Sequence, residues 1–363
     1  MKTMQMLLLM TALVLGSRAH AQYTDASIRH YMARLSSMAA GRSLNESELA
    51  QIKEKRQAAV GLIVGQWMND GFFPESARMM VEAQLSTSGT TADVNFNLPG
   101  NLALHLVKND LPYSGILTAE YCIGDDGQKR ACDTGAPYTA GVLTTRAYMV
   151  KNQSRFNLRR AGRMLKEFAC REYPMETEIQ VPLKAELLIP MFAVVKGDEK
   201  SAFGNGTACY SCHSQFGAHA QFFVKFDSFG NYKADATGLQ GAGKELGRST
   251  DTLMTSHMVQ PEMAMSEKSQ MFGKSAQNLR DGAVILAESD LFVECAIRNV
   301  LKHYLRMPDS DAKAVPAALV KEIAANVRAK SGTSVKATFK DIVRETFTHP
   351  SVINAVLTAT AGK

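Results

Sequence analysis

A C-x-x-C-H motif at Cys209-Tyr210-Ser211-Cys212-His213 constrains this chain more than any other feature of its sequence. C-x-x-C-H is the attachment signature of a c-type heme. Two thiols separated by two residues reach one edge of the macrocycle, where each adds across a vinyl group as a thioether. The histidine that follows lies beside the iron as its proximal ligand. The motif therefore predicts heme c held by Cys209, Cys212 and His213.

Two other interpretations of the motif fit the surrounding sequence less well. A thioredoxin-like C-x-x-C follows a strand in a βαβ unit, and no such pattern surrounds this one. A structural zinc site needs a second pair of ligands at a short, regular spacing. The next cysteine is Cys295, and although His219 and His257 could complete a site, their spacing matches no common zinc module.

The first 21 residues have the three parts of a secretory signal. Lys2 is basic, Met6 to Leu15 is apolar, and Ala19-His20-Ala21 has the A-x-A form of a cleavage site. The apolar run is too short to span a bilayer as a helix, and no cysteine follows it to carry a lipid anchor. We expect cleavage after Ala21 and export to a bacterial periplasm, the compartment where c-type heme is attached.

Four cysteines remain after the two of the motif. An oxidising compartment favours disulfides, and four cysteines allow three pairings. Cys122 and Cys132 flank a turn-rich segment with two glycines, so we predict that they form a disulfide. Cys170 and Cys295 are the remaining pair, but Cys295 lies in an apolar helical pattern, and a buried free thiol is an open alternative.

Charge and composition exclude some classes of partner. The 363 residues carry a net charge of +6, which becomes +4 when Lys2 and Arg18 leave with the signal. The basic residues are scattered and form no dense block interleaved with aromatic residues, so nucleic acid is not an expected partner. We expect no transmembrane span in the mature chain, and a redox partner protein of the cell envelope.

The periodicity of apolar residues predicts a mainly α, multi-helix fold in which a cytochrome c-like heme segment is embedded in larger helical domains. A loose boundary falls near Pro182 to Gly197, so we expect a signal at 1–21, an N-terminal helical domain at 22–190 and a heme-binding domain at 191–363. The expected helices span residues 26–40, 45–70, 74–85, 98–109, 157–170, 275–287, 290–307, 315–328, 335–347 and 351–360.

The residue on the open face of the iron determines what such a heme can do. A methionine gives a closed, higher-potential electron carrier, and an empty position permits peroxide or oxygen chemistry. Met271 is the first candidate, because it lies 58 residues after the motif histidine and before a capped helical pattern. Met263, Met265, His257 and His219 are the alternatives. The methionine-rich stretch around them fits a copper tract less well than flexible core filling.

Several segments of this chain resemble one family. They are Phe226-Asp227-Ser228-Phe229-Gly230-Asn231-Tyr232, Ala140 to Thr145, Arg160 to Leu165, Pro112 to Ala119, and Leu279 to Leu305. In the same order they resemble the motifs of exported cytochrome-like domains of unknown function from planctomycetes and myxobacteria. That family has F-D-x-x-G at this spacing after its heme histidine. The resemblance implies an exported, heme-binding, mostly helical protein.

The chain also departs from that family directly after the motif. The family favours Asp-Pro-x-Gly-Phe where this chain has Gly217-Ala218-His219-Ala220-Gln221, and Val224 replaces a glutamate. These changes affect the hydrogen bonding expected around the heme and leave its covalent attachment unchanged. Asp227 has two possible roles, as an acceptor that tunes the iron or as an ordinary turn residue, and the second is the simpler.

Electron transfer through a single heme is the function that the sequence favours. A peroxidase-type enzyme is an alternative, for which His219, His257 or Glu262 could supply the acid/base group. Many diheme peroxidases carry two C-x-x-C-H motifs and this chain has one, which weighs against that class. A structural or interaction protein stabilised by heme is the third possibility, because the flanking helices exceed what a minimal cytochrome needs.

Overall fold

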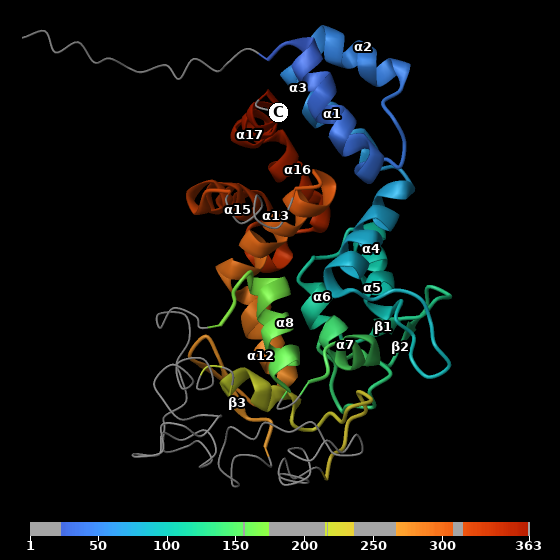
Figure 1. Cartoon of the computed structure of the whole chain (residues 1–363), viewed down its shortest axis with the longest axis vertical. Helices are drawn as coiled ribbons and strands as arrows, with labels where there is room; N and C mark the ends of the chain where they lie inside the picture. The colour runs from blue at the N-terminus through green and yellow to red at the C-terminus, as the bar shows by residue number, and fades with distance from the viewer. Residues whose placement is uncertain are drawn as a thin grey trace, which may run out of the picture.

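The structure is a computed structural model that describes residues 23–154, 157–173, 215, 217–235, 266–307 and 315–361. Its described part is mainly helical, as the sequence predicts, with two short antiparallel hairpins (Figure 1). The predicted signal and the C-x-x-C-H motif lie outside the described residues. So do Met263, Met265 and His257.

The elements follow one another along the chain with short connections. The helices are α1 (Asp25–Ala39), α2 (Glu46–Lys55), α3 (Gln57–Trp67), α4 (Phe72–Leu85), α5 (Leu98–Lys108), α6 (Gly115–Thr118), α7 (Arg146–Lys151), α8 (Leu158–Ala169), α12 (Leu279–Glu288), α13 (Asp290–Tyr304), α15 (Ala317–Ser331), α16 (Phe339–Thr348) and α17 (Pro350–Ala361). Short 3₁₀ turns are η1 (Gly141–Thr144), η4 (Gln221–Phe223) and η5 (Ser334–Lys336). The strands are β1 (Cys122–Ile123) paired with β2 (Lys129–Arg130), and β3 (Ser269–Met271) paired with β4 (Lys274–Ala276).

The single helix expected over residues 45–70 is wrong, because the structure divides it into α2 and α3. Asn45 and Glu48 form a capping box that starts α2, as the sequence suggests. Arg56 then has a φ of +49°, a value outside the helical range that ends α2 and turns the chain into α3. No glycine or proline marks this break, which is why the apolar periodicity runs across it undetected.

Another expected helix, over residues 275–287, begins too early. The structure has β4 at Lys274–Ala276, and α12 starts only after Asn278, whose side chain accepts a hydrogen bond from the backbone N–H of Asp281. Phe272 and Gly273 both have positive φ values and make the turn between β3 and β4. Met271, the first candidate for the sixth ligand, therefore lies on a strand.

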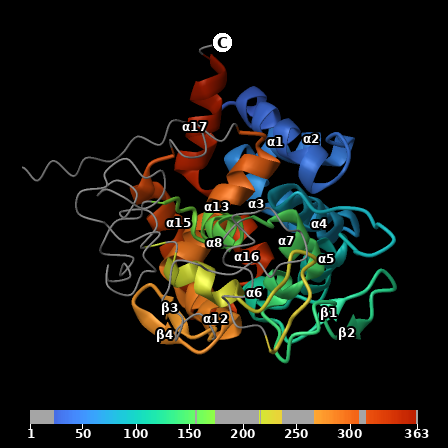
Figure 2. The same ribbon diagram turned by 60° about the horizontal axis from the view of Figure 1, so that its bottom comes forward.

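Helices from both halves of the chain pack around α13. Figures 1 and 2 both show α13 in the middle of the molecule, with α8, α15 and α16 beside it. Helix α1 contacts α13 and α17, so the first and last described helices are neighbours. One buried hydrophobic cluster runs through both halves. The predicted boundary near residue 190 lies outside the described residues, and the domain division stays a prediction.

The predicted disulfide is present, and the remaining two cysteines, whose pairing the sequence left open, form a second one. Cys122 bonds to Cys132 across the β1–β2 hairpin, and Cys170, just after α8, bonds to Cys295 in the middle of α13. The alternative of a buried free thiol at Cys295 is therefore wrong. The second bond joins positions 125 residues apart and fixes α8 to the central helix. Among the described residues, no helix is long and apolar enough to cross a membrane.

Candidate functional site

The described chain resumes two residues after the motif, and this short stretch is the nearest view of the predicted heme site. Gln215 and residues 217–220 are helical, and η4 follows directly. Phe222 and Phe223 are fully buried in the common core. A side chain at Gly282 of α12 would meet the Phe222 ring at 3.0 Å, so the two segments pack closely. The chain leaving the motif is thus fixed to the core.

The F-D-x-x-G segment forms a tight turn around Asp227. One carboxylate oxygen of Asp227 accepts hydrogen bonds from the backbone N–H groups of Phe229 (2.9 Å) and Asn231 (2.8 Å). Gly230 has a φ of +79°, and a Cβ there would lie 2.8 Å from the Cβ of Met149, so both conformation and space require glycine. This geometry supports the interpretation of Asp227 as a turn residue.

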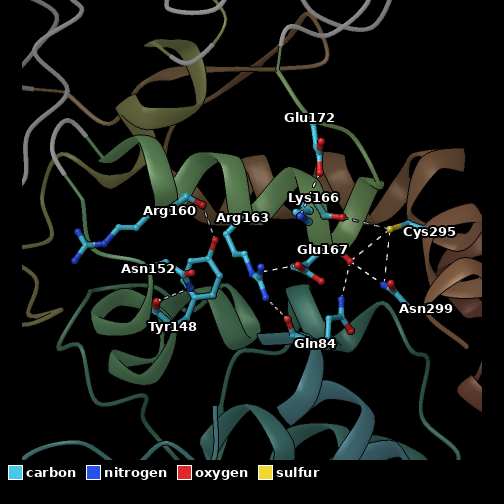
Figure 3. A network of polar contacts seen from close by, with 10 residues as sticks. All are labelled: Gln84, Tyr148, Asn152, Arg160, Arg163, Lys166, Glu167, Glu172, Cys295 and Asn299. Atoms are coloured by element: carbon cyan, nitrogen blue, oxygen red, sulfur yellow. Dashed lines mark hydrogen bonds and ion pairs between the residues drawn. The ribbon is translucent and has the colours of Figure 1, made fainter. Parts of the chain in front are cut away.

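A fully buried arginine from α8 holds this turn in place. The guanidinium of Arg160 donates to the backbone oxygens of Phe226 (3.0 Å), Asp227 (2.6 Å) and Met149 (3.1 Å). It also donates to the side chain of Asn157 (3.0 Å). Burial lowers the pKa of Arg160 to about 10, so the group stays charged at pH 7. At the other end of the residue, the Tyr148 hydroxyl donates to the Arg160 backbone oxygen at 2.6 Å (Figure 3).

Four of the five segments that resemble the cytochrome-like family meet in two pairs, and the fifth, Leu279 to Leu305, packs against α6 and α8. In the first pair, Arg160 of α8 donates hydrogen bonds to the Asp227 turn. In the second pair, the Gly141 N–H donates to the Ala119 oxygen at 3.2 Å. A Cβ at Gly141 would lie 2.1 Å from the backbone oxygen of Ile116, so only glycine permits this approach. These contacts hold segments that are distant in the sequence together, a role that the sequence did not reveal.

Among the candidate site residues that the structure describes, His219 has the most unusual surroundings. Its side chain is fully buried, and its Nδ1 is hydrogen-bonded to the Tyr173 hydroxyl. Its Nε2 is buried with no hydrogen-bond partner. Burial alone lowers the pKa of His219 to about 3, so the imidazole is neutral at pH 7. A neutral, buried ring nitrogen without a partner suits a bound cofactor at this position.

Met271 differs from His219 in being part of the buried hydrophobic cluster. It is fully buried and belongs to the common hydrophobic core. Its role as the sixth ligand stays a prediction, as do those of Met263, Met265 and His257. Within the described ranges, no group of three or more histidine, cysteine or acidic side chains is placed to hold a metal ion.

Sequence reasoning missed a carboxylate that joins three segments near the Asp227 turn. The hydroxyls of Tyr138 and Tyr232 both donate to Glu267, the second at 2.9 Å. Burial raises the pKa of Glu267 in spite of these two hydrogen bonds. The ring of Tyr232 also packs edge-on against Phe226. No local motif marks these residues, because they are far apart in the sequence.

No family model, curated protein or solved structure matches this chain.

Proposed function

We propose that this chain is an exported mono-heme c-type cytochrome that transfers electrons through heme c attached to Cys209 and Cys212, with His213 as the proximal ligand. The observation that carries the proposal is the C-x-x-C-H motif directly before a segment that is anchored in the core. Two disulfides agree with an oxidising compartment. An envelope protein would be its redox partner.

The residues next to the motif fit a buried cofactor. His219 contributes a neutral imidazole whose Nε2 has no partner, and Phe222 and Phe223 anchor the stretch that follows it in the hydrophobic core. When bound, heme supplies an iron that is oxidised and reduced reversibly by one electron. Arg160 and the Asp227 turn keep the following backbone rigid, which limits rearrangement when the charge of the site changes.

A peroxidase-type enzyme is the second candidate, and His219 is the observation that favours it. A buried, neutral histidine could accept a proton from a bound peroxide if one face of the iron were open. The two candidates differ in coordination. An electron carrier has a six-coordinate, low-spin iron, and a peroxidase has a high-spin iron whose spectrum changes when peroxide is added.

The test uses the full chain expressed with a c-heme assembly system. We expect the intact mass to show cleavage after Ala21 and the addition of one heme, and the spectra to be low-spin. A Cys209→Ala, Cys212→Ala variant should lose the covalent heme. The matched control is Cys122→Ala, Cys132→Ala, which also removes two cysteines and should keep the heme. A wild-type protein without covalent heme would overturn the proposal.

Single substitutions then identify the sixth ligand. Met263, Met265, Met271 and His257 are each replaced by alanine, and the absorption spectra are compared with wild type. Replacement of the true ligand should convert the low-spin spectrum to a high-spin one. A wild-type spectrum that is already high-spin and responds to peroxide would favour the peroxidase-type enzyme instead.

A further inference from the structure

The hydrogen bond between the Tyr173 hydroxyl and Nδ1 of His219 fits a neutral imidazole that carries its proton at Nε2. Burial raises the pKa of Tyr173 well above 10, so its hydroxyl stays protonated and is able to donate to Nδ1. An imidazole that accepts at Nδ1 carries its proton at Nε2 when it is neutral. The buried Nε2 is then a donor without an acceptor, and such a group is costly unless a partner is bound there.

The length of chain between His213 and His219 limits where this donor can lie. Residues 217–220 are helical, so the two α-carbons are at most about 17 Å apart, counting the other residues as extended and a rise of about 1.5 Å per helical residue. This keeps His219 close to a heme bound at His213. The short connection also makes it unfavourable for His219 to bind the same iron on the face opposite His213, because the chain would have to pass around the macrocycle.

Heme has one kind of group that can accept a strong hydrogen bond from Nε2 of His219. The macrocycle is apolar apart from its iron and its two propionate carboxylates. An ionised carboxylate in a buried site needs hydrogen-bond donors. No charged side chain among the described residues shifts the pKa of His219. The described surroundings therefore supply no competing ionic partner for the imidazole.

We propose that His219 donates a hydrogen bond from Nε2 to a propionate of the bound heme, and that Tyr173 is the positioning residue that fixes the imidazole by donating to Nδ1. This inference rests on the proposed function. It assigns to His219 a role that differs from axial ligation and from acid/base catalysis. The propionate is held in its ionised form, so the redox potential varies little with pH near neutrality.

The experiment measures the midpoint potential of the heme-loaded protein between pH 5 and 9. Loss of a hydrogen bond to the ionised form raises the pKa of a carboxyl. We expect His219→Leu to move the inflection of the potential–pH curve upward by about one pH unit or more. His219→Gln keeps an N–H donor and should stay close to wild type. Tyr173→Phe should fall between the two.

The controls separate this inference from the proposed function. His303→Leu is the matched control, because His303 also has a buried Nε2 without a partner but lies in α13. It should leave the inflection unchanged. Thermal unfolding checks that each variant is folded, and His219→Gln and Tyr173→Phe keep the test decisive if His219→Leu does not fold.

Three outcomes would overturn the inference while the heme stays attached. They are an unchanged inflection in His219→Leu, an equal shift in the His303→Leu control, and conversion of His219→Leu to a high-spin spectrum. The last result would make His219 an axial ligand. A wild-type protein that attaches no heme would instead overturn the proposed function.

Discussion

Replacing Arg160 by methionine should release the Asp227 turn from the helix that holds it. Arg160 is fully buried, and its guanidinium donates to three backbone oxygens and one side-chain oxygen. Methionine has a similar length, so little volume is lost, and the main effect is to leave buried acceptors without donors. Arg160→Lys should rescue only in part, because an ammonium cannot reproduce the fork of a guanidinium.

The magnitude follows from these hydrogen bonds. Each buried acceptor left unpaired costs about 1–3 kcal/mol, and the relief from no longer burying a charge offsets part of the sum. We expect a net loss of roughly 3–4 kcal/mol in the free energy of unfolding. An unfolding entropy of about 2.1 cal/mol/K per residue, over about 340 residues, converts this to a fall in Tm of roughly 5 °C.

Urea and thermal unfolding followed by circular dichroism would measure the loss. Arg159→Met is the matched control, since Arg159 is the neighbouring exposed residue of α8 and should change stability by less than about 0.5 kcal/mol. Equal stabilities of Arg160→Met and Arg159→Met would refute the reasoning, because the hydrogen bonds of Arg160 would then contribute nothing net.

Two further predictions concern the disulfides and Glu267. Removal of the Cys170–Cys295 bond, which closes 125 residues, should cost about 5 kcal/mol. Removal of the Cys122–Cys132 bond, which closes 10 residues, should cost about 3 kcal/mol in the same urea assay; the reverse order would contradict the loop-closure argument. Burial raises the pKa of Glu267, so the protonated carboxyl favours the folded state. This stabilisation is fully present below about pH 4.3 and is lost as the pH rises through the folded-state pKa. Relative to Glu267→Gln, wild type should therefore lose stability on going from pH 4 to pH 7, and a parallel pH dependence of the two proteins would exclude this shift.

Local signals in the sequence predicted much of the fold. The capping box at Asn45, the apolar periodicity of α8 and α13, and the turn between Cys122 and Cys132 depend on residues close together in the chain. Short-range physics fixes such features, so one sequence suffices to find them. The break at Arg56 was missed because it carries no breaker residue.

The candidate site likewise has some features that the local sequence predicts and others that depend on tertiary packing. The C-x-x-C-H motif is a local pattern, and the sequence alone predicts its chemistry. The Nδ1 of His219 is hydrogen-bonded to Tyr173, which lies 46 residues earlier, and its Nε2 is buried without a partner. The cluster around Glu267 depends on a tyrosine 129 residues away. Burial and the absence of a partner are properties of packing, which no local pattern encodes.

The sequence by itself predicted that this chain is mainly helical, that four of its cysteines could pair, and that one motif marks the candidate site. Only the tertiary structure determined that Arg160 supports the Asp227 turn 67 residues later and that the helices of both halves share one core. The physical reason is range. Helix signals and cofactor motifs act over a few residues, whereas burial, desolvation and hydrogen-bond satisfaction depend on all the segments that meet at one place.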